Sequence, residues 1–176
     1  MSEVVEAGLT ALNALCAERG WRQVTLRDVA EKAGVALTEL YRAAPSKTAL
    51  VDHLGERLDA AALETAATAS EDVHDRLFDA AMARIEAMEP WRPILAGVDG
   101  AALVPLAPHL PKAARAILEA AGVEATAPRL LAMTAVWGRI VQVWRADEGA
   151  LNRTMAEIDK RLKQMRTRLG RIGAGF

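Results

Sequence analysis

The sequence has few aromatic residues and few β-branched runs of strand length. Only 4% of its 176 residues are aromatic, and alanine and leucine are abundant. Alanine and leucine favour helices, whereas strands are usually rich in valine, isoleucine, threonine and aromatic residues. The composition therefore predicts an all-α fold.

The chain also has a single cysteine and no long apolar run. Cys16 has no partner for an internal disulfide and cannot form a cysteine-based metal site alone. It lies on the apolar face of the first helical pattern, so we expect a buried structural thiol. No basic segment precedes an apolar stretch at the amino terminus, and no apolar run reaches membrane-spanning length. We expect a cytoplasmic protein without membrane insertion.

Signals of catalysis are equally scarce. His53, His74 and His109 lie on three different segments, and none has a second ligand at a spacing such as H-E-x-x-H. The chain contains neither a glycine-rich phosphate loop nor a G-x-S-x-G element. We therefore expect no enzyme activity, no catalytic residues, no metal site and no cofactor.

Helical patterns fill the sequence from its beginning. The first part has closely spaced start and stop signals: Ser2, Gly20, a capping box of Thr25 and Asp28, Gly34, Pro45 and Ser46. They predict short helices over 3–19, 25–34 and 35–44, and a fourth helix that begins after Ser46. Longer patterns follow. We expect a module of short helices at 1–52 and a larger helical domain at 53–176.

The larger domain has three distinct parts. Ser70 is a candidate cap for a helix that ends near Met88, and the five prolines and two glycines of residues 90–111 permit only short or broken helices. This segment is a candidate mobile or ligand-gating region. A helix over 126–146 is apolar on nearly every side, and the last helix carries a narrow heptad stripe.

The stripe and the apolar helix need more partner surface than one chain easily provides. We expect a two-fold homodimer in which two helices from each subunit form the interface, with these contact residues: Trp144, Leu151, Met155, Ile158 and Leu162. The alternative is that the stripe packs within its own subunit.

Charge is distributed unevenly along the chain. Residues 1–52 carry six basic and seven acidic side chains, a net charge of −1, whereas residues 151–176 carry seven basic and two acidic ones, a net charge of +5. DNA-binding domains are usually basic, because neutralising phosphates supplies much of their affinity. The basic end is either a solvated helix face or a surface for an anionic partner.

Residues 25–50, TLRDVAEKAGVALTELYRAAPSKTAL, resemble the helix-turn-helix of the TetR/AcrR family of bacterial regulators. The family pattern is roughly T-x-x-x-I-A-x-x-A-G-V-S-x-G-T-L-Y-x-x-F-x-S-K-x-x-L. The chain matches it at the following positions, with Val29 in place of isoleucine: Thr25, Ala30, Ala33, Gly34, Val35, Leu40, Tyr41, Ser46, Lys47 and Leu50. The resemblance covers about the first 55 residues.

This resemblance implies a DNA-binding domain at 1–52 and a ligand-binding and dimerisation domain at 53–176. Members of the family are homodimers that bind an operator with an inverted repeat, usually as repressors, and release it when a small molecule binds. By resemblance, Leu37 and Thr38 approach the bases, whereas Thr25, Tyr41 and Lys47 contact phosphates.

The third helix departs from the family pattern at four positions. Ala36 replaces a capping serine, Thr38 a glycine, Glu39 a threonine and Ala44 a phenylalanine. Glu39 can accept a hydrogen bond from cytosine N4, but a carboxylate repels phosphate. We include Glu39 among the DNA-binding residues.

A second reading is a protein of TetR fold that no longer binds DNA and instead holds a lipid or isoprenoid. Residues 143–162, VWRADEGALNRTMAEIDKRL, are somewhat similar to the tail of the lipid-binding proteins of coenzyme Q biosynthesis. In either reading the larger domain holds a small apolar ligand, and Met82, Trp91, Met133 and Trp137 are candidate lining residues. The alternative for these four is ordinary core packing.

Overall fold

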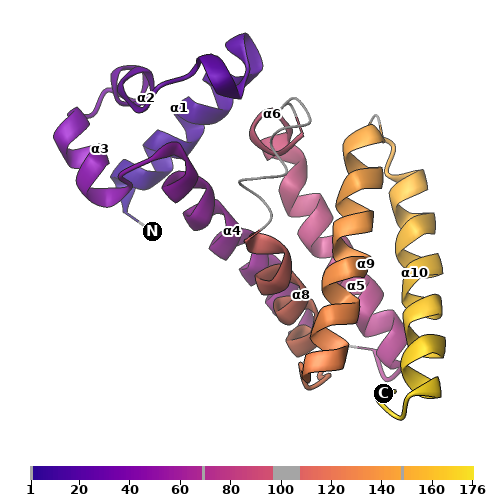
Figure 1. The fold of residues 1–176 in the computed structure, drawn as a ribbon. Coiled ribbons are helices and arrows are strands. Elements are labelled where there is room, and N and C mark those ends of the chain that lie inside the picture. Colours follow the sequence, from indigo (N-terminus) through magenta and orange to yellow (C-terminus); the bar gives the residue numbers. More distant parts are fainter. Residues whose placement is uncertain (1, 69, 97–107, 148) are drawn as a thin grey trace. The chain divides into compact units, whose positions relative to one another are not determined.

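The computed structural model describes residues 2–68, 70–96, 108–147 and 149–176, and this part of the chain is helical without a β-strand. Figure 1 shows the order of the elements: α1 (Glu3–Arg19), η1 (Trp21–Gln23), α2 (Leu26–Ala33), α3 (Leu37–Ala43), α4 (Lys47–Glu64), η2 (Thr65–Thr68), α5 (Val73–Met88), η3 (Glu89–Trp91), α6 (Arg92–Leu95), α8 (His109–Ala120), α9 (Ala127–Ala146) and α10 (Asn152–Arg171). The predicted all-α fold is confirmed. No helix of the described residues is long and apolar enough to cross a membrane.

The described chain divides into two compact units. The amino-terminal unit contains residues 2–57 and 90–96, and the carboxyl-terminal unit contains residues 58–89, 108–147 and 149–176. Helix α4 contributes to both units. The domain boundary predicted between residues 52 and 53 lies inside this helix. The predicted functions of the two domains, DNA binding before the boundary and ligand binding with dimerisation after it, stay predictions.

Caps fix the ends of the first helices. The Ser2 side chain accepts a hydrogen bond from the Val5 backbone N–H at the start of α1, and Gly20 follows its last residue. Ser46 accepts from the Ala49 backbone N–H at the start of α4. Each bond satisfies a helix-terminal group that would otherwise lack a partner. The predicted start and stop signals at these residues are confirmed.

Helices α1, α2 and α3 contact one another in the amino-terminal unit, and α6 also contacts α1. Their core contains Leu9, Leu12, Val29 and Leu40, all of them fully buried. The prediction that Cys16 is buried is confirmed, and burial raises the pKa of its thiol to about 11. Because the thiolate is the reactive form, this thiol is inert at neutral pH.

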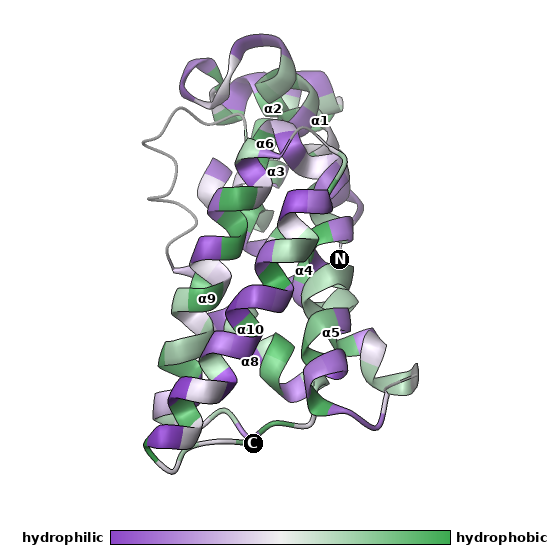
Figure 2. Ribbon diagram, turned by 90° about the vertical axis from the view of Figure 1, so that its right-hand side faces the viewer, coloured by the Kyte–Doolittle hydropathy of each residue, from purple (hydrophilic) through white to green (hydrophobic). Residues whose placement is uncertain are grey.

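Four helices of the carboxyl-terminal unit pack in a ring, and the end of α4 belongs to the same unit. Helix α5 contacts α8, α8 contacts α9, α9 contacts α10, and α10 contacts α5, which gives a closed four-helix arrangement (Figure 1). Hydrophilic and hydrophobic residues alternate along α9 and α10 (Figure 2). Their buried residues include Met133, Trp137, Ile140, Ile158 and Leu162.

The burial of α9 and α10 side chains bears on the predicted dimer contact, which stays a prediction. Ile158 and Leu162 are buried, and so is Trp144 on α9, although the structure contains one subunit. Leu151 is half-buried and Met155 is exposed. Part of the stripe is therefore covered by its own subunit, which favours the alternative that the sequence left open, while Met155 stays accessible to a second subunit. A heptad pattern reports that one face of a helix is buried and not which chain buries it.

Two expectations about helix ends need correction. Asp72, rather than Ser70, caps α5, because its carboxylate accepts from the backbone N–H groups of His74 and Asp75. The patterns also missed α8, which begins near two prolines, Pro108 and Pro111. Proline is tolerated in the first turn of a helix, where its missing N–H has no intrahelical partner to lose. Residues 97–107 of the candidate mobile or ligand-gating region at 90–111 lie outside the described residues, and the described residues 90–96 form only short helices, as expected.

Candidate nucleic-acid interface

The turn between α2 and α3 depends on Gly34. Its φ of 68° lies in the left-handed region, and its N–H bonds to the carbonyls that end α2. A side chain there would be strained, whereas glycine adopts this conformation at little cost. Helix α3 then begins after Ala36, which provides no side-chain cap. The turn therefore joins two short helices in the arrangement of a helix-turn-helix.

Helix α3 buries Leu40, leaves Ala43 half-buried and exposes its other side chains. Leu40 is fully buried, whereas Leu37 is 42% exposed and Tyr41 is 60% exposed. With about 100° between successive residues of a helix, Thr38 and Arg42 lie nearly opposite Leu40. Glu39 and Tyr41 then flank them, one on each side. The structure therefore brings Leu37, Thr38, Glu39 and Tyr41 together on the exposed part of one short helix, as the proposed role of α3 requires.

An open hollow of about 950 Å³ lies between α2 and α3. It is lined by Leu26, Arg27, Leu37, Thr38, Tyr41, Arg42 and Pro45. Two arginines thus border a largely apolar surface that contains three of the predicted DNA-binding residues. Arginine can contact phosphates or guanine, and apolar side chains can contact the thymine methyl group.

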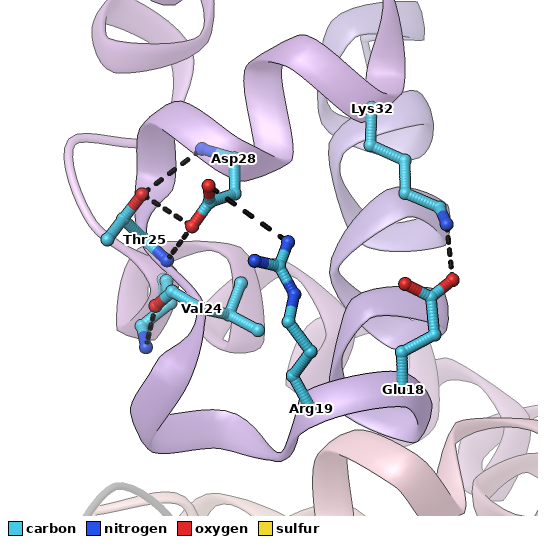
Figure 3. A network of polar contacts seen from close by, with 7 residues as sticks. Glu18, Arg19, Val24, Thr25, Asp28 and Lys32 are labelled. Carbon is cyan, nitrogen blue, oxygen red and sulfur yellow. Dashed lines mark hydrogen bonds and ion pairs between the residues drawn. The ribbon is translucent and has the colours of Figure 1, made fainter.

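Thr25 is already engaged within the module. It forms a capping box with Asp28: Thr25 Oγ1 accepts from the Asp28 backbone N–H, while its own hydroxyl and backbone N–H donate to Asp28 Oδ2 (Figure 3). These bonds from Thr25 hold the pKa of the Asp28 carboxyl below its usual value. The bond to Asp28 occupies the hydroxyl proton of Thr25, so its predicted phosphate contact would compete with the cap.

Lys47 also has partners in its own module. Its ammonium donates to the backbone carbonyls of Trp21 and Val24 and lies 4.5 Å from the centre of the Trp21 ring. Burial lowers the pKa of Lys47. These contacts tie the start of α4 to the short helix η1. Its role as a phosphate ligand stays a prediction.

The net charge of the module conceals how its charges are arranged. Glu6 pairs with Arg57. Glu18 pairs with Lys32, and Asp28 pairs with Thr25 and more distantly with Arg19 (Figure 3). Arg22, Arg27 and Arg42 form no hydrogen bond or ion pair with the described residues. Several acids are therefore locally neutralised while three arginines keep their donors available. A net charge of −1 does not prevent this surface from attracting phosphate.

Sequence reasoning missed Arg27 and Arg42 as candidates. Arg27 follows the capping threonine by two residues, and Arg42 lies one turn after Thr38 on the same helical face. A helical projection of residues 37–43 would have identified Arg42. Arg27 could not be assigned in that way, because the hollow depends on how α2 and α3 pack.

The four predicted ligand-lining residues do not form a single set in the structure. Trp91 belongs to the amino-terminal unit, where the Arg57 guanidinium lies 5.5 Å from the centre of its ring. Met82, Met133 and Trp137 belong to the carboxyl-terminal unit; the latter two are buried and Met82 is half-buried. Their role in ligand binding stays a prediction. The described residues contain no group of three or more potential metal ligands.

A second hollow, of about 460 Å³, lies between α9 and α10. Its lining is mostly apolar with three arginines: Pro128, Leu131, Ala132, Ala135, Val136, Arg139, Arg161, Gln164, Met165, Arg168, Leu169 and Ile172. Leu131 is 74% exposed and Ile172 is 68% exposed. Large apolar side chains with this exposure are candidates for a contact with another molecule.

Comparisons with known proteins agree with this description of the helix-turn-helix. Residues 9–54 match the family model described as bacterial regulatory proteins, tetR family. A comparison with curated proteins by sequence finds no match.

Three solved structures have the same fold along nearly the whole chain. The TetR transcriptional regulator from Nitrosomonas europaea ATCC 19718 has a TM-score of 0.72 and 20% identity, over 93% of this chain and 98% of its own. A TetR transcriptional regulator from Rhodococcus sp. RHA1 has a TM-score of 0.66 and 22% identity, over 91% and 93%. A TetR-family transcriptional regulator from Streptomyces coelicolor has a TM-score of 0.64 and 21% identity, over 97% and 99%.

Proposed function

We propose that this chain, which has the fold of the TetR transcriptional regulators and a helix-turn-helix of the tetR family, is a ligand-responsive, DNA-binding repressor. The observation that carries the proposal is the exposed face of α3. Thr38 and Arg42 lie opposite the single buried residue of that helix, and Arg42 has no ion-pair partner among the described residues. A surface of this kind is unnecessary for folding and suits the edge of a DNA groove.

In this proposal α3 lies in the major groove. Its first residues, Leu37 and Thr38, face base edges, and Glu39 accepts a hydrogen bond from cytosine N4. Arg27 and Arg42 replace Thr25 and Lys47 as the principal phosphate contacts, because the latter two side chains are engaged within the module. Tyr41, which is exposed beside Arg42, adds a further phosphate contact.

The protein acts as a homodimer in the cytoplasm. A two-fold dimer presents two α3 helices to the two halves of an inverted repeat. The exposed residues of the hollow between α9 and α10, notably Leu131 and Ile172, support this contact better than the buried residues Trp144, Ile158 and Leu162. Met155, which is exposed on α10, remains a candidate for the interface.

A small molecule in the carboxyl-terminal unit regulates the DNA complex. Such a molecule can change DNA affinity only if it binds the DNA-bound and free conformations with different affinities. Helix α4 is the continuous element shared by the two units, so in this proposal it carries this difference.

The experiment that tests the proposal is selection of genomic fragments by the purified full-length chain at physiological salt, followed by sequencing. We expect enrichment of an inverted repeat with half-sites one or two helical turns apart. The Thr38→Ala/Arg42→Ala variant keeps the buried Leu40 and serves as the folded control, which should lose the enrichment. No enrichment by the unaltered chain would contradict DNA regulation and leave the lipid-binding reading of the fold.

A further inference from the structure

Helix α5 carries a buried charge. Its buried residues are Leu77, Ala80, Ala81, Arg84, Ile85 and Met88, and Arg84 is the charged one among them. Arg84 is only 4% exposed. A buried guanidinium is costly unless its N–H groups are satisfied by hydrogen bonds and its charge is balanced.

The partners of Arg84 satisfy it incompletely. Asp59 Oδ1 lies 3.0 Å from Nε and 2.9 Å from Nη2, so one carboxylate oxygen faces two guanidinium nitrogens. Nη1 donates to the sulfur of Met88 at 3.4 Å, and thioether sulfur is a weak acceptor. The guanidinium carbon lies over the Trp137 ring, 5.1 Å from its centre. An aromatic ring face is not a conventional hydrogen-bond acceptor. The guanidinium has five N–H donors, and the described residues provide Oδ1 and a sulfur as their acceptors.

This arrangement lacks the geometry that an arginine and a carboxylate usually adopt. In a paired geometry two oxygens accept two parallel N–H bonds, which is stronger and more directional than sharing one oxygen. The side chain of Asp59 is 20% exposed, so solvent reaches the acidic partner although it hardly reaches the arginine. A second carboxylate could therefore approach from the side of Asp59 and offer Arg84 better acceptors.

We infer that Arg84 is the anion-binding residue for an amphiphilic effector, whose carboxylate competes with Asp59 and whose apolar part lies beside Trp137 and Met88. This inference rests on the proposed function, because it names the chemical class of the effector. It also revises the expectation of a purely apolar ligand. Asp59 lies on α4, so a ligand that replaces it at Arg84 changes how α4 is held against α5.

The first test compares two ligands of equal chain length that differ in charge. Decanoate and decanol are titrated into the full-length protein by isothermal calorimetry at neutral pH, below their aggregation concentrations. We expect decanoate to bind at least about tenfold more tightly, because a charged hydrogen-bond pair is gained only with the carboxylate. Equal affinities, or no binding of either ligand, would overturn the inference.

Two variants assign the preference to this pair of side chains. Asp59→Asn removes the competing carboxylate, so decanoate should bind about tenfold more tightly than to the unaltered protein. Arg84→Met combined with Asp59→Leu removes both charges together, which avoids leaving a partly buried carboxylate without its partner. This double variant should bind decanoate and decanol equally. Arg115→Met, at an exposed position of α8, is the matched control and should keep the preference.

The variants also separate a ligand site from a purely structural ion pair. A structural pair predicts that Asp59→Asn lowers the melting temperature and gains no affinity for decanoate, and that result would overturn the inference. Circular dichroism checks that each variant is helical before titration.

Failure of this inference is distinguishable from failure of the proposed function. Operator selection is carried out without any fatty acid, so it reports DNA binding alone. An enriched operator with no preference for decanoate would reject the carboxylate site and keep the regulator. A preference for decanoate without an enriched operator would keep the site and reject DNA regulation, in favour of a carrier of acidic amphiphiles.

Discussion

Helices α3 and α10 use their apolar residues in opposite ways. Helix α3 buries Leu40 and leaves Leu37 and Tyr41 exposed, whereas α10 buries Ile158, Leu162, Met165 and Leu169 within its own unit. The buried side chains of α10 contribute to folding, because each removes apolar surface from water. The exposed side chains of α3 contribute little to it. Their exposure is better explained by a partner, which we propose is DNA because α3 is the second helix of a helix-turn-helix.

The largest expected effect tests this comparison with the same substitution on both helices. Leu162→Ala should lower the free energy of unfolding by about 2–5 kcal/mol, because it removes a fully buried side chain and leaves a cavity. Leu37→Ala should change it by less than about 0.5 kcal/mol, as is usual for an exposed position. Urea denaturation measures both values. Equal destabilisation by the two substitutions would mean that α3 is part of the folding core and that its exposure carries no functional information.

The next effect concerns the two arginines of the hollow between α2 and α3. Arg27→Ala and Arg42→Ala should each weaken operator binding by about tenfold or more, since a hydrogen bond to a charged group contributes about 1.5–3 kcal/mol. Each substitution should also reduce the slope of log affinity against log salt by about 1, as expected for the loss of one phosphate contact. Fluorescence anisotropy at several salt concentrations gives both quantities. Arg115→Ala on α8 is the matched control, and a slope that is unchanged by Arg27→Ala and Arg42→Ala would remove both arginines from the DNA interface.

The sequence predicted the amino-terminal module better than the rest of the chain, and the reason is local. The Thr25–Asp28 capping box, the turn at Gly34 and the caps at Ser2 and Ser46 each depend on residues three or four positions apart. Short-range bonds of this kind can be recognised from spacing alone. For the same reason, the exposed set on α3 could be predicted from the family pattern.

The contacts that sequence reasoning did not foresee join distant segments. The acceptors of Lys47 are the carbonyls of Trp21 and Val24, more than twenty residues earlier, and no spacing rule reveals that pairing. The stripe of α10 was correctly recognised as buried, but periodicity does not say whether the same chain or a second copy covers it. Arg84 was overlooked because its importance arises from burial beside Asp59, which the sequence does not show.

A smaller effect tests which base α3 reads. Glu39→Gln should change the preferred base at one position of each half-site from cytosine to adenine, because glutamate accepts from cytosine N4 and glutamine forms a bidentate pair with adenine. The expected discrimination is about 1–3 kcal/mol. Selection of operators from a randomised pool by both proteins measures it, with Glu31→Gln on the exposed part of α2 as the control. If the unaltered protein and Glu39→Gln prefer the same half-site, Glu39 does not contact a base.

The smallest expected effect concerns Lys47, which lies at the boundary between folding and recognition. Lys47→Met keeps most of the side chain's volume but removes two hydrogen bonds to the carbonyls of Trp21 and Val24 and the contact of its charge with the Trp21 ring. Since it also removes a partly buried charge that is costly to desolvate, we expect a net loss of about 1 kcal/mol in the free energy of unfolding. If Lys47 only holds η1 against α4, the slope of log operator affinity against log salt concentration should not change. If Lys47 instead contacts a phosphate, the slope should fall by about 1. The two measurements together decide whether Lys47 serves folding, as the buried residues of α10 do, or DNA recognition, as proposed for the exposed residues of α3.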